Sequence, residues 1–220
     1  MAMACFLTVT ILWVFSVCLH EFGHAIVAYY GSDTSVRDKG YLTLNPLHYA
    51  HPVYSLVMPV IFLLLGGIGL PGGAVYIEDD RLRSPRWRTA VSLAGPAMNV
   101  LLTLALCVPF WAGLIKPDLD NVGALSLAFL IELQISAVIF NLLPLPPLDG
   151  FRALSPWIAP DTRDRLMAQS GVFIWGLFLV MWYVPVVNQT FFDLVFAMLD
   201  LLDIDRHLAI FGWREFQFWR

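Results

Sequence analysis

Hydrophobic residues gather into long runs along this chain, with short polar stretches between them. Three runs, residues 4–30, 89–114 and 122–143, are each long enough to cross a bilayer, since a spanning helix needs about 20 residues. A fourth run at 171–187 is shorter, and the run at 190–202 is too brief to cross unless it continues from the fourth. This pattern predicts an all-α polytopic membrane protein.

The apolar run at residues 53–70 differs from the others because Pro59 and the pair Gly66-Gly67 interrupt it. A re-entrant element that dips into the membrane and returns tolerates such residues. With this element, which we expect to re-enter, the chain has four to six membrane segments.

The basic residues support the re-entrant interpretation and predict an orientation. If 53–70 re-enters, all of them except Lys116 fall on one side, which should be the cytoplasm. If 53–70 crosses the membrane instead, Arg37 and Lys39 lie on the same side as Lys116. The excess of basic residues on the other side is then smaller, but that side is still the predicted cytoplasmic one. The basic residues on the cytoplasmic side of the re-entrant arrangement are Arg37, Lys39, Arg81, Arg83, Arg86, Arg88, Arg152, Arg163, Arg165, Arg206, Arg214 and Arg220.

Two short segments, 40–45 and 73–77, are partly β-branched and bounded by glycine or proline. They predict two small β-strands near the cytoplasmic face. The chain shows no internal repeat, low-complexity tract or soluble linker, so we expect one membrane-embedded domain over residues 1–220.

Composition agrees with a membrane protein and narrows its partners. Hydrophobic residues make up 59% of the chain and charged residues 14%, more apolar surface than a soluble domain of this size can bury. A net charge of −4 leaves no basic surface for nucleic acid. Cys5, Cys18 and Cys107 lie in apolar runs without paired spacing, so we expect buried thiols. The first run lacks a basic start and a small-residue cleavage site, which argues against a removable signal peptide.

Ionisable residues interrupt the first apolar run in the pattern H-E-x-x-H, at His20, Glu21 and His24. Histidines four residues apart share one face of a helix and can both bind zinc, while the glutamate can take a proton from metal-bound water. His20 lies about 15 Å along the helix from Tyr30, below the membrane surface. Each such group costs roughly 2.5–3.5 kcal/mol to insert, so a role limited to hydrogen bonding within a bundle is disfavoured.

Asp149 is the best candidate for the third protein ligand that a catalytic zinc requires. It follows a stretch in which Pro144, Pro146 and Pro147 end a helix and favour extended backbone. Unwound backbone at membrane depth must line a cavity or be buried in protein. The alternative is a surface turn, because Asp-Gly is a common turn pair.

The segment His20 to His24 together with Asn141 to Gly150 resembles the site-2 protease family of intramembrane zinc metalloproteases. The two motifs of that family are HExxH and an NxxPxPxLDG-like segment, and both occur here in order on apolar segments. The stretch Ala94 to Asn99 resembles a further family element, so the similarity covers about residues 10–155.

This resemblance implies roles for five residues. His20, His24 and Asp149 would hold one Zn²⁺ per chain, Glu21 would be the general base, and Asn141 would lie near the scissile carbonyl. The substrates would be transmembrane segments of membrane proteins.

The resemblance also implies an architecture and a location. It is to the compact form without a PDZ domain, with a catalytic core at about 4–155 and C-terminal helices at about 165–220. The protein would lie in the lipid bilayer of a bacterial inner membrane, with its active site toward the cytoplasm.

Two asparagines in apolar helices can also be interpreted from the chemistry of their side chains. Amide side chains in apolar helices occur mainly where they form a hydrogen bond. The NH₂ of Asn141 could stabilise an oxyanion, or it could equally form a hydrogen bond between two helices. We expect Asn99 to cap or bridge helices, because Gly95 and Ala97 beside it permit close helix contact.

One segment departs from the family pattern N-P-x-x-H-x-D-P. When residues 45–52 are aligned with this pattern, Tyr49 stands where the family has histidine and His51 stands where it has aspartate. His48 and His51 could titrate near the site, but loop histidines are more often solvated or hydrogen-bonded, which is what we expect here.

Two other interpretations compete with an Asp149-based protease. A membrane metal transporter or sensor could use the same ligands, but it would not need Glu21. A different membrane protease fold would take its third ligand from a glutamate on a later helix, where Glu132 is the only one within an apolar run.

Overall fold

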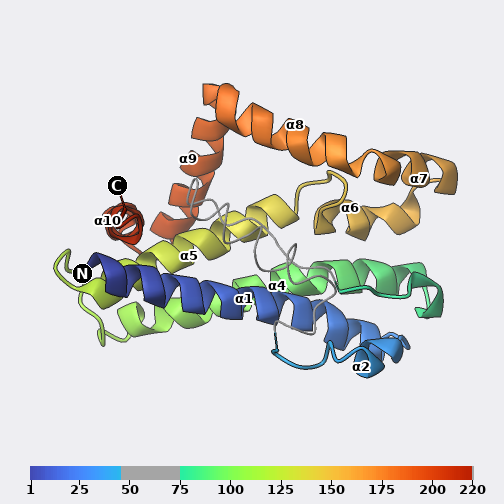
Figure 1. Ribbon diagram of the computed structural model, residues 1–220, viewed down its shortest axis with the longest axis horizontal. Helices are drawn as coiled ribbons and strands as arrows, with labels where there is room; N and C mark the ends of the chain where they lie inside the picture. The colour runs from blue at the N-terminus through green and yellow to red at the C-terminus, as the bar shows by residue number, and fades with distance from the viewer. Residues whose placement is uncertain (46–74, 220) are drawn as a thin grey trace.

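Three long helices form the body of the protein and lie side by side along its longest axis (Figure 1). The computed structural model describes residues 1–45 and 75–219. The three helices are α1 (Ala2–Tyr30), α4 (Pro85–Trp111) and α5 (Val122–Asn141). Each is long and apolar enough to cross a membrane. The predicted runs at 4–30, 89–114 and 122–143 are therefore confirmed as helices, with ends shifted by a few residues.

The hairpin between α4 and α5 follows from residues at its two ends. Gly113 has a positive φ of 67°, a conformation that glycine adopts without strain, two residues after the end of α4. Asn121 then caps α5, because its side-chain oxygen accepts hydrogen bonds from the backbone N–H groups of Gly123 and Ala124. The polar stretch between the two helices thus reverses the chain.

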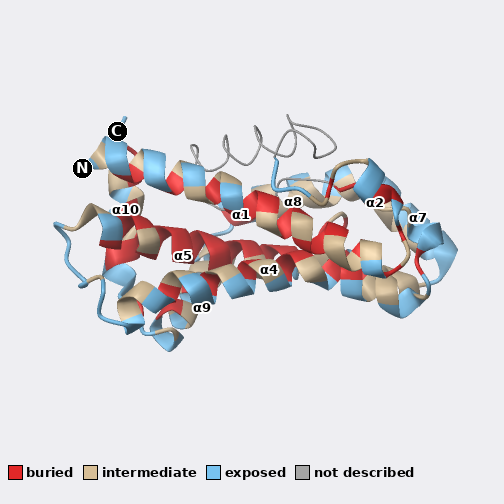
Figure 2. Ribbon diagram, turned by 90° about the horizontal axis from the view of Figure 1, so that it is seen from below, coloured by how far each residue is buried: buried red, intermediate tan, exposed pale blue. Residues whose placement is uncertain are grey.

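Helix α5 is the central helix of the bundle, and Figure 2 shows it buried along most of its length. One side of α5 packs against α1 through Phe129 and Leu133, which meet Val9 and Trp13. Its other side forms a second cluster with residues of α4, α9 (Pro185–Leu201) and α10 (Arg206–Phe216). The three cysteines are buried thiols, as expected.

The C-terminal part of the chain adds shorter helices. Helix α8 (Ser170–Tyr183) follows α7 (Pro160–Ala168) with a bend of 58°, and this pair counts as a fourth candidate span if its two parts cross together. The described residues thus contain three candidate spans, or four with the bent pair, against a prediction of four to six membrane segments that included the element at 53–70. The expected re-entrant element at 53–70 lies outside the described residues.

The segments that carry the predicted chemistry meet at one end of the bundle. The backbone N–H of Arg83, just before α4, donates to the carbonyl of Gly31, just after α1, at 3.1 Å. Thr89 in α4 donates through its hydroxyl to the carbonyl of Ala153 at 2.7 Å, in the short helix α6 (Asp149–Leu154) that follows α5. The end of α1, the start of α4 and the end of α5 therefore share one end of the bundle.

The two predicted β-strands are not confirmed, since no strand forms within the described ranges. Residues 40–45 make turns and bends, and residues 75–78, here called the strap, have no regular structure. Side chains bind the strap backbone instead of a neighbouring strand. Lys39 Nζ donates to the Tyr76 carbonyl at 3.1 Å, and the Glu78 N–H donates to Asp33 Oδ2 at 2.8 Å. Lys39 also bonds the Glu78 carboxylate, which lowers the pKa of Glu78.

Candidate metal centre

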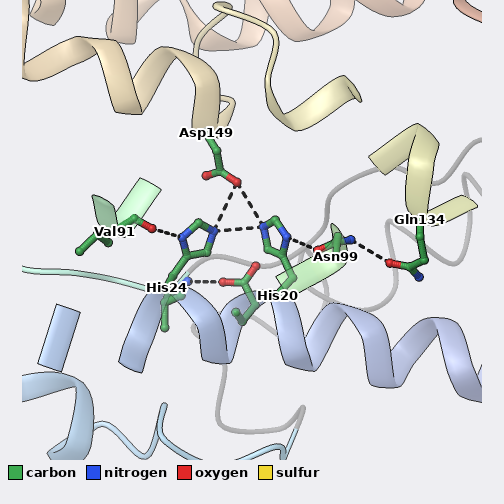
Figure 3. Close-up of polar contacts among 8 residues, drawn as sticks. His20, His24, Val91, Asn99, Gln134 and Asp149 are labelled. Atoms are coloured by element: carbon green, nitrogen blue, oxygen red, sulfur yellow. Dashed lines mark hydrogen bonds and ion pairs between the residues drawn. The ribbon is translucent and has the colours of Figure 1, made fainter. Parts of the chain in front are cut away.

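Helices α1 and α6 bring His20, His24 and Asp149 to one point (Figure 3). Oδ2 of Asp149 lies 3.2 Å from Nε2 of His20 and 3.3 Å from Nε2 of His24, and the two Nε2 atoms lie 3.1 Å apart. All three side chains are largely buried. The sequence predicted these three residues as one group, and the structure places them together.

Hydrogen bonds on the far side of each imidazole decide where its proton lies. Nδ1 of His24 is 2.7 Å from the carbonyl oxygen of Val91, and Nδ1 of His20 is 2.7 Å from Oδ1 of Asn99. Both partners are oxygens that only accept, so both Nδ1 atoms must donate. Each neutral imidazole therefore presents a lone pair at Nε2, toward Asp149.

When both imidazoles are neutral, three lone-pair atoms face one another within 3.3 Å, an arrangement that a bound cation stabilises. Oδ2 of Asp149 is buried and has no hydrogen-bond partner among the described residues. Zinc bonds of about 2.0–2.1 Å in a tetrahedron place neighbouring ligand atoms about 3.3 Å apart, close to the three distances measured here. Two imidazoles and one carboxylate also form a typical catalytic zinc set that leaves a position for water. The donor set fits zinc.

Glycines of α1 and α4 make room for the histidines. A Cβ atom added at Gly95 would lie 2.6 Å from Nε2 of His20 and would also clash with Nε2 of His24. A Cβ at Gly23 would lie 2.8 Å from the carbonyl oxygen of Ala94, so this glycine lets the two helices approach closely. Close helix contact at Gly95 was predicted, and the groups that approach it are the imidazoles themselves.

A compact turn after α5 delivers Asp149 to the histidines. The helix ends at Asn141, two residues before the predicted run does, and the prolines do not produce an extended run. The chain turns instead, and the Leu148 N–H donates to the Leu145 carbonyl at 2.8 Å. A Cβ at Gly150 would clash with the carbonyl oxygen of Leu142, so only glycine lets α6 start this close to the end of α5. Asp149 begins α6 with a buried side chain and does not form a surface turn.

Glu21 lies beside this group but bonds elsewhere. Its side chain is 3% exposed, and its Oε2 accepts a hydrogen bond of 3.0 Å from the backbone N–H of Val75 in the strap. This bond involves one of the two carboxylate oxygens of Glu21. Residues 54 positions apart in the chain therefore set the position of the predicted base.

Asn99 bridges helices as predicted, and it bonds Gln134, a residue that was not predicted from the sequence. Its Oδ1 accepts from His20, and its Nδ2 donates to Oε1 of Gln134 in α5 at 2.9 Å. Gln134 could have been found in the sequence because it is an amide side chain in the middle of an apolar helix, the feature that also identified Asn141.

The sequence offered four further candidates, Glu132, Asn141, His48 and His51. Glu132 is buried in α5 and is not a member of the group, so the fold with a glutamate as third ligand is not supported. Asn141 is 3% exposed at the end of α5, and its part in the chemistry stays a prediction. His48 and His51 lie outside the described residues.

Comparison with known proteins agrees with this geometry. The sequence model of "Peptidase family M50" matches residues 8–116. The chain is 41% identical over 210 residues to "Putative zinc metalloprotease Rip2" of Mycolicibacterium smegmatis, covering 94% of this chain and 78% of that protein. It is 42% identical over 207 residues to the Rip2 protein of Mycobacterium tuberculosis, with the same coverage. It is 29% identical over 208 residues to "Putative zinc metalloprotease YwhC" of Bacillus subtilis, covering 89% and 88%. No solved structure matches significantly.

These similarities extend over nearly the whole chain, including both segments that supply the buried histidines and aspartate. The chain belongs to peptidase family M50, the site-2 protease family of zinc metalloproteases, in its compact form without a PDZ domain.

Proposed function

We propose that this protein cuts peptide bonds in or near the transmembrane segments of membrane-protein substrates, with zinc held by His20, His24 and Asp149. The observation that carries the proposal is that Oδ2 of Asp149 lies within 3.3 Å of two buried imidazoles, which belong to a helix long and apolar enough to span a membrane. A buried set of this kind at membrane depth is costly unless it serves a function.

The depth of the site supports a substrate bond that lies within the membrane. His20 is ten residues before the end of α1, which corresponds to about 15 Å along the helix axis. A transmembrane helix hides its own amide groups in hydrogen bonds, so the substrate must unwind locally before it is cut. The compact turn at 142–148 is not a free strand edge, so the segment 40–45 and the strap are the candidates among the described residues for pairing with an unwound substrate.

The residues around the metal position have separate tasks in hydrolysis. Bound zinc would supply a Lewis acid that polarises the scissile carbonyl and favours deprotonation of water. Glu21 takes the proton of the attacking water and delivers it to the nitrogen of the leaving amine. The amide NH₂ of Asn141 donates a hydrogen bond to the carbonyl oxygen as negative charge develops on it.

The same proposal includes a location and a domain organisation. The basic residues near the ends of α1 and α4, such as Arg37 and Arg83, favour a cytoplasmic position for the end of the bundle that carries the site. The relatives named above are bacterial, which supports the inner membrane of a bacterium. Residues 1–220 act as one domain, with the catalytic core at about 4–155 and the C-terminal helices at about 165–220.

The decisive experiment replaces Glu21 with glutamine in purified protein reconstituted with single-span substrates in proteoliposomes. Zinc content should stay at one ion per chain, while cleavage should fall by at least about a hundredfold, because the base is lost and the ligands are not. Cleavage at the unmodified rate would remove Glu21 from the mechanism. The same variant can trap substrates, which mass spectrometry then identifies.

A metal transporter or sensor with the same ligands is the alternative, and the comparisons do not favour it. Transport has no use for a base between the histidines. Zinc flux into proteoliposomes that survives Glu21→Gln, without proteolysis by the unmodified protein, would support the alternative.

A further inference from the structure

We propose that Gln134 is a positioning residue for the metal centre, which keeps His20 in the tautomer that can bind zinc. It does so through Asn99. This inference rests on the proposed role of His20 as a zinc ligand and extends it to a residue on a different helix.

The three side chains form a buried line across the three long helices (Figure 3). His20 belongs to α1, Asn99 to α4 and Gln134 to α5. Nδ1 of His20 is 2.7 Å from Oδ1 of Asn99, and Nδ2 of Asn99 is 2.9 Å from Oε1 of Gln134. Gln134 is fully buried and Asn99 is 5% exposed, so water does not readily replace either bond.

The chemistry of the amide group gives this line a direction. An asparagine amide has an acceptor oxygen at one end and a donor NH₂ at the other. While Gln134 presents its oxygen, the NH₂ of Asn99 points to Gln134 and the oxygen of Asn99 points to His20. His20 must then carry its proton on Nδ1, and Nε2 keeps the lone pair that faces Asp149.

Without the acceptor oxygen of Gln134, nothing in this line keeps the NH₂ of Asn99 turned away from His20. The Asn99 amide can then rotate and offer its NH₂ to Nδ1 of His20, which favours the tautomer with the proton on Nε2. That tautomer cannot bind a metal through Nε2. His24 has no such dependence, because its Nδ1 bonds the backbone carbonyl of Val91, which has no donor end to present.

The first test measures zinc affinity by competition with a chelator, in purified protein in detergent. Gln134→Met keeps the size of the side chain but has no strong acceptor, and it should weaken zinc binding by roughly tenfold or more, the usual range for changes around a metal ligand. Gln134→Glu keeps an acceptor oxygen whether or not it is ionised, and its affinity should stay within about threefold. Glu132→Gln is the matched control, since Glu132 is also buried on α5 but lies outside this line.

The second test separates direction from packing. In the Asn99→Asp background the group beside His20 is a carboxylate, which has no NH₂ to turn toward Nδ1. Gln134→Met should then weaken zinc binding by less than about threefold, so the two substitutions are strongly non-additive. A residue that only fills space would give the same loss in both backgrounds.

The outcomes also separate this inference from the proposed function. If His20→Ala and Asp149→Ala keep full zinc affinity, the proposed ligand set is wrong. If those variants lose zinc while Gln134→Met binds it normally, or if Gln134→Glu loses as much affinity as Gln134→Met, the ligand set stands and the role of Gln134 is overturned. Equal losses from Gln134→Met in the two backgrounds would overturn it as well. Unfolding of the zinc-free proteins, followed by circular dichroism, should be alike for all variants.

Discussion

The backbone N–H of Val75 donates a hydrogen bond of 3.0 Å to Oε2 of Glu21, which joins the strap to the proposed base. The strap is held in turn by Lys39 and Asp33, which bond the backbone of Tyr76 and Glu78. A carboxylate fixed through one oxygen can turn less freely, so the other oxygen keeps a defined position for the proton transfer.

Val75→Pro removes this N–H group and should reduce kcat. A hydrogen bond to a charged group contributes about 1.5–3 kcal/mol, which corresponds to a loss of roughly ten- to a hundredfold if the whole bond supports the transition state. Cleavage rates in proteoliposomes measure the effect. Val75→Ala keeps the N–H and serves as the control, and zinc content should be unchanged in both variants. Full activity of the proline variant would show that the bond has no part in catalysis.

Gly95→Ala should disable the metal centre. The added methyl group would fall 2.6 Å from Nε2 of His20 and clash with His24, so at least one imidazole must move away. We expect zinc affinity to fall by at least about tenfold, measured by chelator competition. Gly176→Ala is the matched control, because a Cβ there meets nothing within 4 Å. Normal zinc binding by the Gly95 variant would mean that the histidines do not occupy the observed positions.

Asp149→Ala should abolish zinc binding, whereas Glu132→Ala should not. Oδ2 of Asp149 lies within 3.3 Å of both imidazoles, while Glu132 is outside the group. Metal analysis of the purified variants gives the stoichiometry, expected to be near zero for the first and about one per chain for the second. The reverse result would revive a fold whose third ligand is a glutamate.

Removal of zinc should lower the stability of the protein as well as its activity. The metal would connect α1 to α6, and a ligand that binds only the folded state at a thousand times its Kd adds about 4 kcal/mol. Thermal unfolding with and without a chelator measures the difference, and added zinc should restore it. Asp149→Ala should show no shift on chelation. A shift of equal size in that variant would place the stabilising metal elsewhere.

The metal centre was predictable from the sequence because its chemistry is encoded locally. The spacing of His20 and His24 places both on one face of any helix, and the segment with Asp149 has a composition that requires burial at membrane depth. The all-α architecture followed from run lengths alone. Neither inference depends on how the helices pack.

The contacts that pass between helices were not predictable. Gln134 reaches Asn99 only because α4 and α5 pack in one particular register, and Val75 reaches Glu21 only because the strap returns to α1. The predicted strands are not confirmed for a related reason. The pattern at 73–77 satisfies strand preferences, but in the strap Lys39 and Asp33 bond the backbone of Tyr76 and Glu78.

The most direct test of the account is an anomalous difference map at the zinc absorption edge, from crystals of the zinc-loaded protein. We expect one peak about 2.0–2.2 Å from Nε2 of His20, Nε2 of His24 and Oδ2 of Asp149. A peak elsewhere, or no peak between these three atoms at full zinc loading, would contradict it.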